Sequence, residues 1–241
     1  MEFDMVDEVS TLVTPSLHPE NVKKIDGYSE ETAAVLGPTE ETLRLAYRSV
    51  EDVFKARAAA SLNPTWNEAA QAIATQEYAD KVFDKVARSF DSTRDRLVKG
   101  IASLEKELSA PVESKASLQV SQEVRAHFKT LPTEKRMSLL RKAIVEGDHT
   151  TATAVLGAPS YLSGFTPEMQ AVMLRDYHTR HSPHVANRLR AMEGAKAMLE
   201  SRSSLVFSEL ERAVGMPPHK VKKLREAKDA AEQAMVLRDV A

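Results

Sequence analysis

The chain has 241 residues, of which 42% are hydrophobic, 5% are aromatic and 28% are charged, and it contains no cysteine. This balance is typical of a soluble protein, and the lack of cysteine excludes disulfides, thiolate catalysis and cysteine-based metal centres. The formal net charge is −2, but residues 1–120 carry 14 basic and 21 acidic side chains, while residues 121–241 carry 19 and 14. This asymmetry favours head-to-tail association or an acidic partner for the C-terminal half, and two ordinary solvated surfaces are the alternative.

Residues 1–37 are predicted to form an acidic, loosely structured arm. They hold eight acidic and two basic residues, and prolines and glycines interrupt them. Such a stretch is typical of a mobile arm that folds on a partner. Its acidic start lacks the basic region of a secretory signal. The chain also has no apolar run of about 18 residues, so no membrane-spanning helix is predicted.

Residues 38–110 are predicted to form a hairpin of two long helices. The first begins at Thr39 and ends near Pro64, because the residue before a proline is pushed out of the α region. The second begins at Thr65. Its large apolar side chains recur every seven residues: Phe83, Phe90, Leu97 and Leu104. Gly100 weakens this helix by about 1 kcal/mol relative to alanine, and we expect a bend there.

Residues 111–181 are predicted to form several short helices. Gly147 suits the left-handed residue that ends one helix, and Asp148 suits the cap of the next. Thr166 followed by Pro167 is a strong helix start, because it combines a capping side chain with a proline at the first helical position.

Residues 182–241 are predicted to form a long heptad helix followed by a basic C-terminal helix. Ser182 caps the heptad helix and Gly215 ends it. Its apolar residues keep a 4-3 spacing, and this seam comprises Val185, Leu189, Met192, Leu199, Val206, Leu210 and Ala213, with Lys196 and Ser203 in the two remaining slots. Such a stripe packs against another helix, within one chain or between chains. The elements together predict an all-α fold, either an elongated helical bundle or helical hairpins with long, coiled-coil-like helices.

The C-terminal helix carries a candidate basic patch. Its residues are Lys220, Lys222, Lys223, Arg225 and Lys228. A positive patch fits phosphate or an acidic protein surface, and an ordinary solvated helix face is the alternative. Because no aromatic residues are interleaved and no recognition-helix signature surrounds the patch, sequence-specific DNA reading is weakly supported.

A metal site at Asp176, His178, His181 and His184 is not predicted. Pro183 breaks the helix between the last two histidines, so we expect capping or surface roles instead. No phosphate-binding loop, dinucleotide fingerprint, nucleophile elbow or zinc-protease motif occurs in the sequence. We therefore predict no catalytic residue, no cofactor and no metal, and a protein that is not an enzyme.

Trp66 is the only tryptophan of the chain. It lies near a predicted helix start. It is interpreted as a local packing anchor, with an interface role as the alternative.

The segment from Ala154 to Glu168, AVLGAPSYLSGFTPE, resembles a segment of proteins encoded by tailed phages and prophages, and the similarity spans residues 131–181. The resemblance implies a bacterial virus, with the host cytoplasm or the virion as location. It also implies a virion structural or assembly role. Phage scaffolding proteins are similar in style, being helical, charged and without cysteine, with a basic C-terminal helical segment that engages the coat.

Three hypotheses follow for function. The first is a virion structural or assembly protein that forms homo-oligomers and contacts other virion or assembly proteins through helix seams and charge. The second is a nucleic-acid-associated helical protein that uses the basic C-terminal helix. The third is an enzyme without a recognisable short motif.

Overall fold

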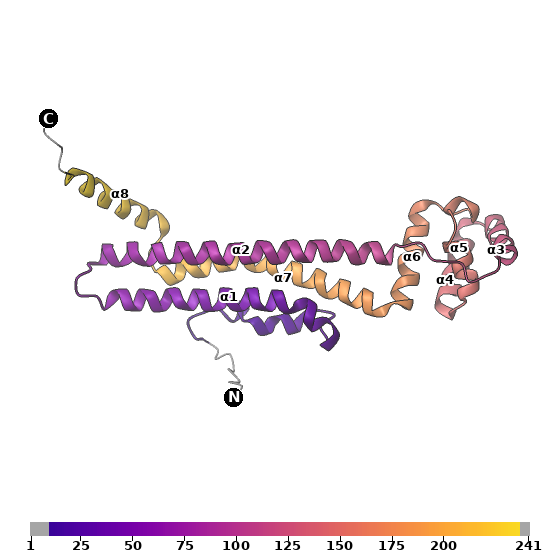
Figure 1. Ribbon diagram of the computed structural model, residues 1–241, viewed down its shortest axis with the longest axis horizontal. Helices are drawn as coiled ribbons and strands as arrows, with labels where there is room; N and C mark the ends of the chain where they lie inside the picture. Colours follow the sequence, from indigo (N-terminus) through magenta and orange to yellow (C-terminus); the bar gives the residue numbers. More distant parts are fainter. Residues whose placement is uncertain (1–9, 237–241) are drawn as a thin grey trace. The chain divides into compact units, whose positions relative to one another are not determined.

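The structure, a computed structural model, describes residues 10–236. It is 81% helical and has no strand in that range, so the all-α prediction is confirmed. The helices, with η denoting 3-10 helices, are η1 Pro15–Leu17, η2 Pro19–Lys24, α1 Glu30–Ser61, α2 Glu68–Leu108, α3 Leu118–Thr130, α4 Thr133–Glu146, α5 His149–Leu156, η3 Ser160–Leu162, α6 Pro167–His181, α7 Pro183–Val214 and α8 Pro218–Ala234 (Figure 1).

The chain divides into two compact units. Unit 1 comprises Met1–Leu97 with Gly194–Ala241, and unit 2 comprises Val98–Glu193. Two long helices, α2 and α7, each contribute residues to both units. The four serial regions expected from the sequence therefore do not coincide with the units, because unit 1 joins segments that lie far apart in the chain.

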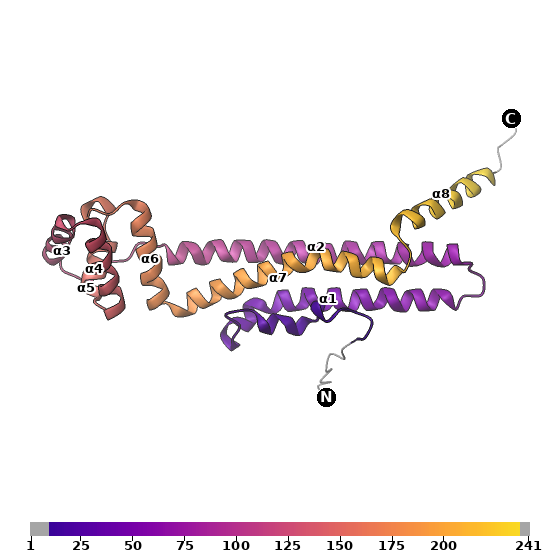
Figure 2. The ribbon, with the colours of Figure 1, turned by 180° about the vertical axis from the view of Figure 1, so that it is seen from behind.

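In unit 1, α1, the first part of α2 and the last part of α7 lie side by side (Figures 1 and 2). Thr42 Oγ1 on α1 lies 2.9 Å from Thr93 Oγ1 on α2. Arg94 Nε on α2 lies 3.3 Å from Glu200 Oε1 on α7. The buried side chains of these helices are mainly aliphatic and small: Leu43, Ala46, Val50, Val53, Val86, Leu97, Ala195, Leu199, Val206 and Leu210. The interior of unit 1 therefore consists of thin helix-to-helix seams, as the many alanines and few aromatics predict.

Residues 10–28 pack onto unit 1. Four apolar side chains of this stretch are buried: Val13, Leu17, Val22 and Ile25. The Ser10 backbone N–H donates to the Tyr47 hydroxyl at 2.8 Å. Gly194 on α7 permits the close approach of Ile25, since a Cβ at Gly194 would lie 2.5 Å from Ile25 Cγ2.

The expectation of a loosely structured arm is thus corrected for residues 10–37, while residues 1–9 lie outside the described range. Two prolines that suggested a loop, Pro15 and Pro19, occupy the first position of η1 and η2. A proline costs nothing there, because the first N–H of a helix has no partner within the helix.

α1 begins at Glu30, not at Thr39 as expected. The residue before it, Ser29, donates its backbone N–H to Thr32 Oγ1 at 2.7 Å, which fixes the helix start. Pro38 lies inside the helix. The residue preceding this proline is a glycine, whose missing Cβ relieves the clash that usually ends a helix at this point.

Two buried threonines on α1 are expected to respond oppositely to the same substitution. The Thr42 hydroxyl bonds Thr93 at 2.9 Å and Ser89 at 3.0 Å, whereas Thr39 Oγ1 is buried without a partner among the described residues. Thr42→Val should lower the free energy of unfolding by about 1–2 kcal/mol, and Thr39→Val should leave it unchanged or raise it by up to about 1 kcal/mol. Chemical denaturation of both variants tests the contrast, and destabilisation of equal size in both would contradict it.

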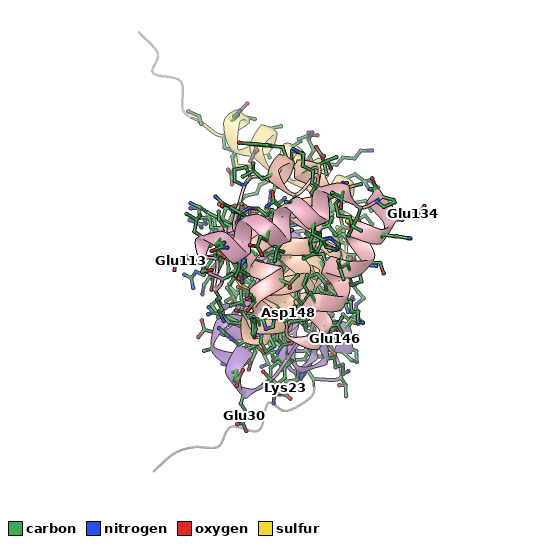
Figure 3. The ribbon with its side chains drawn as sticks, turned by 90° about the vertical axis from the view of Figure 1, so that its right-hand side faces the viewer. Lys23, Glu30, Glu113, Glu134, Glu146 and Asp148 are labelled. Atoms are coloured by element: carbon green, nitrogen blue, oxygen red, sulfur yellow. The ribbon has the colours of Figure 1, made fainter. Side chains whose placement is uncertain are left out.

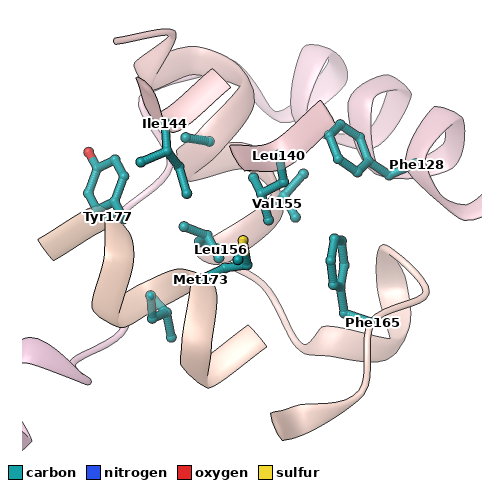
Figure 4. Packing of buried hydrophobic residues seen from close by; sticks show 10 residues of the cluster. Phe128, Leu140, Ile144, Val155, Leu156, Phe165, Met173 and Tyr177 are labelled. Atoms are coloured by element: carbon teal, nitrogen blue, oxygen red, sulfur yellow. The ribbon is translucent and has the colours of Figure 1, made fainter. Parts of the chain in front are cut away.

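Unit 2 has its own core between α3, α4, α5 and α6 (Figure 4). The buried cluster comprises Phe128, Leu140, Ile144, Ala152, Val155, Leu156, Phe165, Met173, Leu174 and Tyr177. Around it the predicted helix boundaries are confirmed. Gly147 adopts φ 73° at the end of α4, and Asp148 Oδ1 accepts the Thr151 N–H at 3.0 Å at the start of α5. Glu146 and Asp148 flank this junction (Figure 3).

Gly100 does not interrupt α2, which runs unbroken from Glu68 to Leu108. A Cβ at Gly100 would collide with the terminal methyl of Met192. The missing Cβ at Gly100 leaves space that the flexible end of Met192 fills within unit 2.

Candidate functional site

Val221 is the one buried residue of the C-terminal helix α8, Pro218–Ala234. Gly215, with φ 76°, adopts the left-handed conformation that turns the chain out of α7. Figures 1 and 2 show α8 leaving the bundle of unit 1 at this point. Residues 226–236 are exposed throughout. Because most of the stability of a helix in a protein comes from packing, and α8 packs so little of its surface, it has free energy to gain from an added contact.

The structure keeps the predicted basic patch on the surface. Lys220, Lys222, Lys223 and Lys228 are exposed, and Arg225 is half-buried. Arg225 Nη2 lies 3.0 Å from Asp80 Oδ2 on α2, so this residue anchors α8 to its own unit. The four lysines remain available to another molecule.

Charge is unevenly distributed along α8. Residues 218–225 hold four cations and no acid, while residues 226–234 hold three acids and one cation. Two of the lysines have an acid one turn further along: Lys222 Nζ lies 4.0 Å from Glu226 and Lys228 Nζ lies 3.8 Å from Glu232. The positive character of the patch is therefore concentrated in the first two turns of the helix.

The predicted seam is buried within the chain. Its exposed fractions are 7% or less at Val185, Leu189, Met192, Leu199, Val206, Leu210 and Ala213. The question left open by the sequence, whether this stripe packs within or between chains, is answered by that burial.

The histidines near the α6–α7 junction do not converge. His178 Nε2 lies 2.8 Å from the Ala110 carbonyl oxygen. The His181 ring centroid lies 4.3 Å from that of Tyr177 and 4.5 Å from that of His149. Sequence reasoning missed His149, because it is remote in the chain and carries no spacing signal.

The remaining members of that set have separate roles. Asp176 lies 3.9 Å from Arg180 on the same helix, and His184 is exposed on α7. Within residues 10–236, no three side chains of the ligating types come together in a way that could hold a metal ion.

The His181 imidazole makes the stability of unit 2 depend on pH. His181 is exposed as a whole, but partial desolvation of its ring beside Tyr177 and His149 lowers its pKa below 6.5, and the nearby positive or titratable groups lower it further: His149, Lys115, Arg180 and His178. The unfolded chain then binds a proton more readily than the folded one, so stability is complete above pH 6.5 and falls as the pH drops below it. The pKa of Asp148 is lowered by its bonds to Thr151, so this carboxylate affects stability only when the pH falls below its ordinary pKa of 3.8.

Replacing His181 by glutamine should therefore flatten the loss of thermal stability between about pH 7 and pH 5. The loss below about pH 4, which depends on carboxylates such as Asp148, should remain. Melting temperatures measured across both windows test this. A variant that keeps the wild-type slope above pH 5 would show that His181 does not cause it.

An exposed apolar surface lies where α1 ends and α2 begins. Leu62 is 83% exposed, and Trp66 and Tyr78 are each 40% exposed. Between the helices is a cleft of about 350 Å³, walled by Trp66, Tyr78, Ala56, Ala59, Ala60 and Ala74. Trp66 was singled out from the sequence, but the cleft was not, because alanines at helical spacing give no distinct signal.

Unit 2 holds an open groove of about 400 Å³ between α3, α4 and α5. Val124, Phe128 and Leu139 contribute apolar lining, and Glu123 and Glu146 contribute carboxylates. His127, Lys142, Asp148 and Thr151 complete its polar lining.

The comparisons with known proteins gave no match among family models, curated proteins or solved structures. None of the helices described between residues 10 and 236 is sufficiently long and apolar to cross a membrane.

Proposed function

We propose that this chain is a structural or assembly protein of a bacterial-virus particle, acting through helix-to-helix and charge-mediated contacts with other protein chains. The observation that carries the proposal is α8, which buries only Val221 in its own unit and keeps four lysines in solvent. A helix with this exposure suits docking onto another chain. The viral context rests on the resemblance of residues 131–181 to phage and prophage proteins.

The buried α7 stripe supports the same function in another way. With Leu199, Val206 and Leu210 each below 5% exposed, the helices of unit 1 are held together by their own seam. A firmly packed bundle presents the α1–α2 loop as a defined surface, which lowers the entropy lost on binding.

Sedimentation velocity of the full chain tests this function. At micromolar concentration we expect species larger than one chain, with a population that grows with concentration. A single compact monomer over the whole concentration range would contradict the proposal.

One observation favours a second candidate, a nucleic-acid-associated protein. Lys220, Lys222 and Lys223 are exposed in a stretch of α8 that has no acid. Binding of a duplex should then weaken with salt, with a slope of about −0.9 for each neutralised phosphate. Changing the three lysines together to glutamate should abolish retention of the duplex, and unaltered retention would eliminate this candidate.

A further inference from the structure

The end of unit 1 where α1 meets α2 has the character of a protein interface. We define residues 58–80 as the tip. Leu62 is 83% exposed, and Trp66 and Tyr78 stand beside the alanine-walled cleft. Tryptophan and tyrosine are enriched among the residues that contribute most to interface affinity, and clustered exposed apolar groups mark interaction sites.

The tip is acidic where α8 is basic. Residues 58–80 carry Glu68, Glu77 and Asp80 and no basic residue, although Arg57 lines a recess with Glu68 and Lys81 follows directly, while residues 218–225 carry four cations and no acid. Glu68 and Glu77 are exposed. The ion pair between Arg225 and Asp80, at 3.0 Å, shows that the two surfaces already meet once within a chain. Complementary charge of this kind orients an encounter and excludes wrong partners.

The outer part of α8 has an apolar side that its own unit leaves exposed. Ala227, Ala231 and Ala234 follow helical spacing, and Met235 beyond them is 80% exposed. Small side chains let a helix approach another surface closely, and a flexible methionine fills irregular space.

We propose that the tip of one copy binds α8 of a second copy, with the lysines of α8 against Glu68 and Glu77 and its small residues toward Trp66 and Tyr78. The inference rests on the proposed function and names the partner of α8 within it. We assign a second copy of this chain as the partner, because each copy carries both surfaces: the basic helix α8 and the acidic tip with its exposed apolar groups.

The placement of the two surfaces within unit 1 favours a closed dimer. α8 and the loop between α1 and α2 lie at the same end of unit 1 (Figures 1 and 2), as the Arg225–Asp80 pair requires. Two copies related by a two-fold axis can therefore each donate α8 and receive the other's. The contact then forms twice, which doubles the buried area and leaves no open end.

Trp66 provides a built-in reporter of this contact, because it is the only tryptophan and it belongs to the tip. Its fluorescence emission should move to shorter wavelength as the full chain is concentrated, since association removes water from the indole. Two charge-reversed chains provide the test. One carries Lys220→Glu, Lys222→Glu and Lys223→Glu, and the other carries Glu68→Lys and Glu77→Lys.

Each reversed chain places like charges across both contacts of a dimer, so each alone should associate at least about tenfold more weakly than the unchanged chain. Mixing the two restores opposite charges at both contacts and should bring back the emission shift. The matched control reverses three exposed lysines of unit 2, Lys99, Lys129 and Lys135, and should behave as the unchanged chain. Circular dichroism confirms that all the chains fold.

The outcomes separate the two proposals. If the unchanged chain sediments as larger species but Trp66 emission stays constant, or if both reversed chains still shift it, the tip is not the partner of α8 and the inference fails alone. If the unchanged chain is monomeric, the proposed function fails with it. Recovery only in the mixture supports the inference.

Discussion

Replacing Phe128 by alanine is expected to lower the free energy of unfolding of unit 2 by about 3–5 kcal/mol. Phe128 is 1% exposed, and its ring centroid lies 6.3 Å from that of Phe165. It packs against α4 and α5 residues such as Leu140 and Val155 (Figure 4). The loss combines the transfer of the ring from water with the cavity that the small core cannot close.

Hydrogen exchange localises that effect, because amides of α3 to α6 should lose protection in the variant. Val120→Ala is the matched control on the same helix, since Val120 is 41% exposed and should cost less than about 0.5 kcal/mol. Equal costs for the two substitutions would mean that Phe128 is not part of a closed core.

The second large effect is expected at Arg136, which holds the end of α3 to the rest of unit 2. Its Nε donates to the Phe128 carbonyl at 2.9 Å, its Nη2 donates to the Leu131 carbonyl at 2.7 Å, and its Nη1 donates to the carbonyl of Gly164. Arg136→Ala should cost about 3 kcal/mol of unfolding free energy, because three carbonyls lose a charged donor at once.

Arg136→Lys distinguishes geometry from charge. An ammonium group keeps the charge but cannot serve three carbonyls from a planar fork, so most of the loss should remain. The neighbouring exposed Lys135→Ala should change the unfolding free energy by less than about 0.5 kcal/mol. Full stability in Arg136→Lys would show that charge alone suffices. Chemical denaturation of the three variants provides these comparisons.

Local signals in the sequence predicted the helices of residues 133–214 well. Gly147, Asp148 and Thr166 act through short-range geometry: a left-handed residue or a side chain that accepts an N–H one turn away. Those effects depend on a few neighbouring residues, so they are visible without the fold. The 4-3 stripe of α7 likewise identified buried positions, because its period follows from helix geometry alone.

What the sequence could not show depends on contacts between distant segments. Thr39 looked like a helix start, yet α1 already begins at Glu30 and continues through Pro38, which the preceding glycine permits. Residues 10–28 looked loose, because only the fold reveals that Ile25 meets Gly194. For residues 10–28, tertiary packing overrides local preference.

The candidate site was likewise only partly predictable from the sequence. The lysines of α8 were found from the sequence, because a cluster of basic residues is visible without knowing what it contacts. The acidic tip, its alanine-walled cleft and the Arg225–Asp80 pair were missed, because they require knowing that α8 returns to the start of α2.

The central claim is that α8 works by contact with another chain. Hydrogen exchange of the α8 amides, residues 222–234, measured as the concentration of the full chain is raised, tests it most directly. A helix that buries only Val221 should exchange rapidly in the dilute chain and become protected as copies associate. Protection of α8 that stays the same at every concentration would contradict the account.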